Sequence, residues 1–131
     1  MAGIALATRG HARKPVAYAI VDLPRALSTN NLWMVARGRM ILTPEYRAWK
    51  EECGHALNRS NPGCVSGPYG LTIYLNSKSR CDLGNIEKAC SDLLQEHGVI
   101  DNDRKAQIIR LERSSNVPGI QVQVTQCKES A

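Results

Sequence analysis

The sequence predicts an α+β domain in which a single mixed β-sheet carries two main helices packed on one face. Apolar and polar residues alternate over residues 71–75 and 120–124, a pattern typical of half-buried strands. Longer stretches with helical spacing or helix-start signals occupy residues 44–58 and 83–97. Strands joined by short antiparallel turns, together with two helices, favour a two-layer arrangement with the helices on one side.

The first strand and a hairpin open the predicted fold. Residues 16–23 form a β-branched and apolar run that Pro24 closes, which indicates a strand. Residues 32–42 contain Arg37-Gly38-Arg39 between apolar residues, which predicts a hairpin with glycine at its turn.

The first helix has a clear start signal. Thr43 is a good N-cap residue and Pro44 suits the first helical position, so we expect a helix over residues 44–58. Residues 61–68 are rich in Pro and Gly and predict a loop, after which residues 71–75 form a strand.

The second helix is predicted over residues 83–97. Asp82 occupies the N-cap position, Gly98 ends the helix, and the apolar face follows at steps of three and four residues: Leu83, Ile86, Cys90, Leu93 and His97. Residues 107–113 and 120–124 then form the last two strands.

Composition indicates one domain. A chain of 131 residues can bury a core, and 43% hydrophobic with 22% charged residues is typical of soluble proteins. We expect a basic, flexible tail over residues 1–15, a folded body over 16–126 and a frayed end over 127–131. No apolar run approaches the ~18 residues of a membrane span, and the N-terminus lacks the apolar region of a signal peptide. We therefore expect a cytoplasmic protein that does not enter a membrane.

The five cysteines predict reduced thiols. They contain no Cys-x-x-Cys pair and are odd in number, which argues against a zinc site and a disulfide framework. Cys81 precedes Asp82, whose carboxylate would raise the pKa of the thiol, so Cys81 is not expected to be a nucleophile.

A net charge of +5 suits a polyanionic partner. Residues 1–15 supply three of these charges and contain no acid. The folded body, residues 16–126, is then close to neutral, so a basic patch on it requires cations that lie close together in the fold. The candidate cations are Arg37, Arg39, Lys78, Arg80, Arg104 and Lys105. Lys78 and Arg80 stand directly before Asp82, where they would hold phosphates. The alternative for each pair is a solvated loop.

Carboxylates at both ends of the second predicted helix have the layout of a magnesium site. Asp82 precedes the helix, while Asp101 and Asp103 follow it. Mg²⁺ prefers oxygen ligands and needs only one or two protein carboxylates when phosphate supplies others. If the strand after the helix pairs with the strand before it, we expect these carboxylates to converge near the helix start. The alternative is that they are ordinary cap and turn residues.

Three motifs resemble the RusA-type Holliday junction resolvases. The core signature is similar to Asp82-Leu83-x-Asn85-x-x-Lys88-Ala89, then Asp92-Leu93-Leu94, then Gly98-Val99-Ile100-x-x-Asp103. Upstream, Ser28-x-Asn30-x-x-Trp33 resembles an N-terminal element of that family, and Leu42-Thr43-Pro44-Glu45-Tyr46-x-x-Trp49 resembles the start of its first helix. The likeness extends over about residues 22–126.

This resemblance implies an endodeoxyribonuclease that uses Mg²⁺ to resolve four-way DNA junctions, in recombination and repair, by paired symmetric nicks. It also implies a homodimer. Asp82 and Asp103 would bind the metal, Lys88 would lie beside the scissile phosphate, and Asn85 would orient the site. Asn30 would join the basic pairs in binding DNA.

One position departs from the family pattern Asp-x-Asp-Asn. Gly84 replaces the second acid and has no side chain that can bind a metal. Asp101, Glu87 or the Asn85 amide would have to substitute. Two alternatives follow: a junction-binding protein with weak or no nuclease activity, or a small fold of unrelated function with an unremarkable acidic turn.

Overall fold

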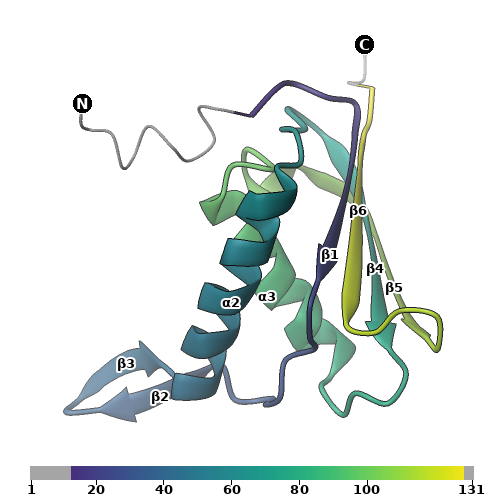
Figure 1. Cartoon of the computed structure of the whole chain (residues 1–131). Helices are drawn as coiled ribbons and strands as arrows, with labels where there is room; N and C mark the ends of the chain where they lie inside the picture. Colours follow the sequence, from purple (N-terminus) through teal and green to yellow (C-terminus); the bar gives the residue numbers. More distant parts are fainter. Residues whose placement is uncertain (1–12, 129–131) are drawn as a thin grey trace.

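A computed structural model describes residues 13–128 and has the predicted α+β architecture (Figure 1). Its four-stranded sheet has the order β1-β6-β4-β5, and a separate two-stranded sheet pairs β2 with β3. The strands are β1 Tyr18–Leu23, β2 Trp33–Ala36, β3 Arg39–Leu42, β4 Tyr69–Asn76, β5 Ala106–Ser114 and β6 Ile120–Gln126. The helices are α2 Pro44–Ser60, α3 Leu83–Glu96 and the short 3-10 helix η1 Asp103–Lys105.

The helix boundaries follow from local chemistry. The Thr43 hydroxyl accepts a hydrogen bond from the Tyr46 amide at 3.3 Å, and proline occupies the first turn of α2. Asn61 ends α2 in the left-handed region, with φ of 49°. His97 follows the last residue of α3, and Gly98 turns the chain away with φ of 75°. Both helices lie within two residues of their predicted bounds.

The strand directions decide where the ends of α3 lie. β6 is antiparallel to both β1 and β4, whereas β4 and β5 are parallel, with Tyr69 opposite Ala106 and Asn76 opposite Ser114. A parallel pair needs a long crossover, which here is α3. Because α3 carries the chain back along the sheet, its start and its end lie at opposite ends of the sheet.

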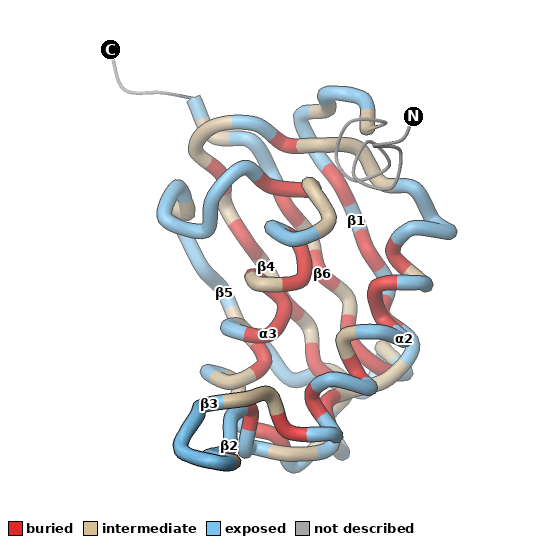
Figure 2. Tube along the Cα trace, turned by 90° about the vertical axis from the view of Figure 1, so that its left-hand side faces the viewer, coloured by how far each residue is buried: buried red, intermediate tan, exposed pale blue. Residues whose placement is uncertain are grey.

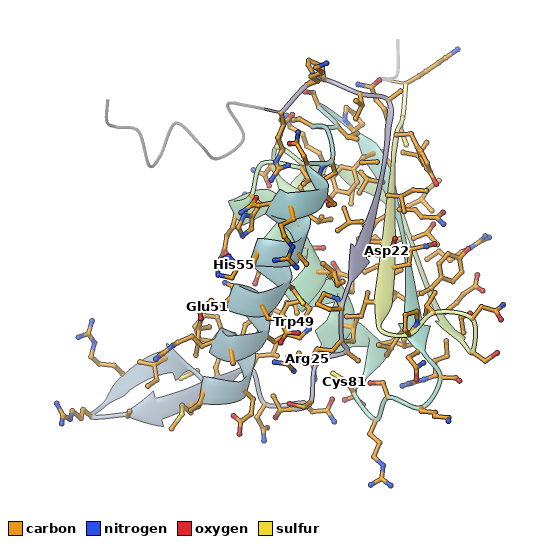
Figure 3. The ribbon with its side chains drawn as sticks, viewed as in Figure 1. Asp22, Arg25, Trp49, Glu51, His55 and Cys81 are labelled. Atoms are coloured by element: carbon orange, nitrogen blue, oxygen red, sulfur yellow. The ribbon has the colours of Figure 1, made fainter. Side chains whose placement is uncertain are left out.

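The core lies between the sheet and the two helices, which cover the same face of the sheet (Figure 2). Alternate residues of β1, β4 and β6 are buried, as the period-two pattern predicted. With no Phe in the chain, Tyr46 and Trp49 of α2 fill the centre, and the Trp49 indole donates to the Arg25 carbonyl at 3.0 Å (Figure 3). The opposite face carries polar side chains such as Gln121, which donates to Asp22 at 3.0 Å.

Residues 13–15, which the sequence assigned to the tail, contact the body. The Arg13 guanidinium donates to the carbonyls of His97 and Pro62 at 2.6 and 3.0 Å and to Asn58 Oδ1 at 2.7 Å. The Cys64 amide donates to the Lys14 carbonyl at 2.8 Å. The earlier part of the tail, including Arg9, and the last three residues lie outside the described residues.

All five cysteines are free thiols, as predicted. No helix within residues 13–128 is long and apolar enough to span a membrane.

Candidate active site

The loop that leads from β4 into α3 is fixed by the end of β5. The Arg113 guanidinium donates to the carbonyls of Ser79 and Cys81 at 2.7 and 2.9 Å. On the other side of the loop, the Cys81 thiol donates to the Thr29 carbonyl at 3.4 Å. Figure 3 places Cys81 at the end of the molecule where this loop lies. Three segments that are distant in sequence therefore meet at the start of α3.

Asn30 forms hydrogen bonds with Asp82 and Asn85, the two candidate site residues at the start of α3. Its Oδ1 accepts a hydrogen bond from the Asp82 amide at 2.7 Å, and its carbonyl accepts one from Asn85 Nδ2 at 3.0 Å. The Asp82 amide is thus satisfied by a residue more than fifty positions away, which no local cap pattern could indicate.

The Asp82 carboxylate is exposed and has no hydrogen-bond or ion-pair partner within residues 13–128. Asp82 occupies the N-cap position, as predicted, but its side chain makes no cap hydrogen bond. An unpartnered carboxylate on a fixed backbone is suited to bind a cation.

A cleft of about 410 Å³ adjoins the Asp82 loop. Its walls include Ser28, Asn30, Lys78, Ser79, Arg80 and Cys81. Lys78 and Arg80 are exposed and contribute two positive charges to it. The cleft therefore combines cations with polar groups, a combination that suits a phosphate backbone.

Lys88 lies one helical turn beyond Gly84 and is exposed. It forms no ion pair with Asp92, whose carboxylate accepts a hydrogen bond from the Tyr46 hydroxyl at 3.3 Å. The ammonium group is consequently available at the solvent-facing side of α3. A Cβ built on Gly84 meets nothing within 4 Å, so this position is also open.

Asp103 lies at the other end of α3. Its amide donates to Gln95 Oε1, near the helix C-terminus, at 2.9 Å. Asp101 is in the same region and accepts hydrogen bonds from the Gly67 amide at 2.8 Å and from Lys105 Nζ at 3.4 Å. Arg104 and Lys105 belong to η1 and thus to this end as well.

The expected convergence of the carboxylates is wrong for a single chain. A helix the length of α3 spans ~20 Å, and that length separates Asp82 from Asp103. The strands before and after α3 do pair, but they are parallel. Asp103 therefore lies near the first residues of β4 and β5, whereas Asp82 lies beyond their last residues. Accordingly, no cluster of three or more potential metal ligands occurs in the part of the chain that the structure describes.

The two predicted substitutes for the missing acid have other partners. Within one chain, Asp101 lies with Asp103, remote from Gly84, and its carboxylate is held by the Gly67 amide and Lys105. Glu87 accepts a hydrogen bond from the Ser91 hydroxyl at 2.6 Å. Neither carboxylate contacts Asp82, so the Asn85 amide is the neighbouring side chain that remains.

Two protonation states are fixed by burial. Burial, together with the Asp82 charge, raises the pKa of the Cys81 thiol, so it stays protonated and is not a nucleophile, as predicted. Burial also raises the pKa of Tyr69 to about 12, and the charges of Asp103 and Glu87 add to this effect. The Tyr69 hydroxyl therefore remains a donor toward the Asp103 carbonyl, at 3.5 Å.

Two residues that hold the site were not predicted from the sequence, Arg113 and Gln95. Arg113 holds the loop before α3, and Gln95 accepts the hydrogen bond from the Asp103 amide after it. Arg113 pairs with Leu75 in the sheet and so shares the helix-facing side with Ile109 and Leu111. A cation at a position where the alternation calls for an apolar residue was the signal that could have identified it.

Comparison with protein-family models gives a match to the model described as Endodeoxyribonuclease RusA over residues 24–125. A search among curated proteins gives no match. The matched range contains the whole Asp82 loop, α3 and Asp103.

Proposed function

Because the chain belongs to the RusA endodeoxyribonuclease family, we propose that it is a magnesium-dependent endonuclease that resolves four-way DNA junctions by paired symmetric nicks. The family membership implies junction resolution. The observation that carries the proposal is the exposed, unpartnered Asp82 carboxylate on a fixed loop beside a cation-lined cleft.

The cleft supplies the contacts for one DNA strand. Lys78 and Arg80 would bind phosphates on either side of the scissile bond, and Asn30 would hold the Asp82 loop in register with them. Such contacts position the backbone and carry no sequence information.

A two-fold dimer through β5 would complete the site. β5 is a nine-residue edge strand, and two neighbouring apolar residues, Ile108 and Ile109, are 64% and 47% exposed. A long, unpaired edge with exposed apolar residues is prone to aggregation unless it is covered, and an identical β5 is a cover of matching length and chemistry. β1, the other edge strand, is shorter, with six residues.

Antiparallel pairing of two β5 strands would bring Asp82 of one chain close to Asp103 of the other. The start of one β5 would lie beside the end of the other. Asp103 lies three residues before the start, and Arg113 near the end contacts the Asp82 loop. Each dimer would then have two sites, and each site would combine Asp82 of one chain with Asp103 of its partner. Two equivalent sites also suit two symmetric nicks.

In this site the oxygen ligands of both aspartates fit Mg²⁺, which would neutralise phosphate charge and lower the pKa of a bound water. Lys88 would stabilise the negative charge that develops on the phosphate oxygens. Asn85 donates to Asn30 through Nδ2, which leaves its Oδ1 to accept a hydrogen bond from a water molecule and orient it. The two clefts would hold the strands while Asn30 keeps each loop in place.

Gly84 favours a second candidate, a junction-binding protein with weak or no nuclease activity. The position is open and lies in the first turn of α3, yet it contributes no ligand. Binding without magnesium-stimulated cutting would identify this second function.

A direct test compares a synthetic four-way junction with a linear duplex of the same sequence, each with and without Mg²⁺. We expect the protein to cut the junction only when Mg²⁺ is present, and to bind the junction with or without Mg²⁺. Equal, salt-sensitive binding of both DNAs with no cutting would contradict both candidate functions.

We predict that Gly84→Asp lowers the Mg²⁺ concentration required for half-maximal cutting. The new side chain has space, its charge suits the start of the helix, and aspartate has a better helix propensity than glycine. Single-turnover cleavage over a Mg²⁺ titration measures the effect. Glu87→Gln and Asp101→Asn serve as controls and should leave the midpoint unchanged. A shift in either control, with none for Gly84→Asp, would show that one of those acids already supplies the third carboxylate.

We predict that Lys88→Met lowers the single-turnover rate on bound junction by about 10²–10³-fold, as removal of one electrostatic contact does in other active sites. The matched control is Lys78→Met, which should weaken junction affinity and leave the rate of the bound complex unchanged. The reverse pattern, with affinity lost in Lys88→Met at constant rate, would make Lys88 a phosphate anchor.

A further inference from the structure

The β2–β3 hairpin has an apolar face that is exposed over most of its length. It stands beyond the N-terminal end of α2 and forms a sheet of its own (Figure 1). Residues directly opposite in an antiparallel pair share a face, so Trp33 and Leu42 lie on the same face as Val35 and Met40. Three of these four are exposed, Trp33 by 46%, Val35 by 67% and Met40 by 64%, while Leu42 at the root packs against the core.

Such a hairpin requires a partner. An isolated two-stranded ribbon is marginally stable in water, and an exposed apolar patch marks an interaction site. Its root is nevertheless firmly held. The Thr43 amide donates to the Leu32 carbonyl at 3.0 Å, the Thr43 hydroxyl donates to the Asn31 carbonyl at 2.7 Å, and Leu32 itself is buried.

The tip of the hairpin is cationic. Arg37 and Gly38 have φ of 52° and 74°, which fits a type I′ turn, and Arg39 follows. Both arginines are exposed and form no ion pair within residues 13–128. An aromatic and aliphatic face beside two arginines complements nucleic acid, because bases stack on the apolar face while phosphates bind the cations.

The hairpin starts at the candidate active site. Asn30, which accepts the Asp82 amide hydrogen bond, stands three residues before Trp33. A four-residue strand extends ~13 Å, so the hairpin reaches a short distance from the cleavage site. At a four-way junction, the base pairs that border the branch point can expose a face on which an aromatic side chain stacks.

We propose that the hairpin is a wedge that places Trp33, Val35 and Met40 against the terminal base pairs of the branch point, with Arg37 and Arg39 on the flanking phosphates. Apolar side chains act in this way where proteins unstack or kink DNA. This inference rests on the proposed function and adds the means by which the protein would distinguish a branch from a continuous duplex.

The test uses the full chain without divalent cations, so that DNA stays uncut. Trp33 is one of two tryptophans, and the other, Trp49, is fully buried. We expect the junction to quench Trp33 fluorescence more than an equal duplex does. Trp33→Ala should weaken junction affinity by roughly 5- to 150-fold, the range for loss of one stacked base, with duplex affinity unchanged. Trp33→Phe should recover most of the loss.

The matched control is Tyr18→Ala, since Tyr18 is an aromatic residue of equal exposure, 47%, on β1. It should leave both affinities unchanged. Unaltered junction affinity in Trp33→Ala, with no quenching in the parent, would overturn the wedge. Conversion of a dimer into monomers by Trp33→Ala, seen by sedimentation, would also overturn it and assign the face to a second copy of the chain. If the parent shows no preference for the junction at all, the proposed function itself fails.

Discussion

Mixing Asp82→Asn chains with Asp103→Asn chains is expected to restore nicking that neither variant has alone. In the proposed dimer, each substitution would remove one of the two carboxylates from both sites, and an amide could not replace the charge that would hold Mg²⁺. In a mixed dimer one site contains both amides, while the other contains Asp82 of one chain and Asp103 of the other. Random exchange should therefore regain about a quarter of the parental sites.

The measurement follows single-turnover cleavage of a junction after the two variants are equilibrated together or co-produced with different tags. The product should be a junction nicked on one strand, since a mixed dimer has one working site. Each variant alone should still bind the junction, which controls for folding. Absence of nicking in a verified mixed dimer would mean that the two aspartates do not act across the chain interface.

Ile109→Lys is expected to convert the proposed dimer into monomers and to abolish junction cleavage. Lysine on an edge strand is a common means by which proteins prevent strand pairing, and a two-fold axis would bring two such charges together. Because Ile109 is 47% exposed in the single chain, the fold itself should persist, which circular dichroism can verify.

Ile20→Lys provides the matched control on the opposite edge, β1, where Ile20 is 45% exposed. Sedimentation equilibrium and cleavage should both match the parent protein. Monomers produced by Ile20→Lys, with an intact dimer in Ile109→Lys, would move the interface to β1 and would leave the separation of Asp82 from Asp103 unexplained.

Local signals were sufficient to predict most of the fold. The cap and proline at Thr43 and Pro44 fixed the start of α2, and the alternation in β4 and β6 identified the buried face of each strand. The glycine between Arg37 and Arg39 located the hairpin turn. Each of these features depends on residues a few positions apart, which is the range over which side-chain periodicity and turn chemistry act.

The site was harder to predict because it depends on strand direction. The period of a strand gives its buried face and says nothing of which neighbour it pairs with or in which direction. A signal did exist, since strands joined through a helix of this length pair in parallel. Applied to Asp82 and Asp103, that rule would have separated them within one chain. The roles assigned to both residues remain predictions.

The contacts of Asn30 and Arg113 with the Asp82 loop were outside the reach of pattern reasoning. Asn30 comes from the segment before the hairpin and Arg113 from the end of β5, so both depend on the finished tertiary structure. The structure shows that Asn30 holds the Asp82 loop, while its predicted role in DNA binding remains a prediction.

The hydrogen bonds of Arg113 with the Asp82 loop bear on how the cutting rate depends on protein concentration. The strand that contains Arg113, β5, is also the edge strand at which two chains would pair. On this architecture a lone chain has half a site, so at protein concentrations below the dimer dissociation constant the cutting rate rises with the square of the concentration. A twofold change in copy number would then become a fourfold change in activity, and a cell that contains few copies would leave its four-way junctions uncut.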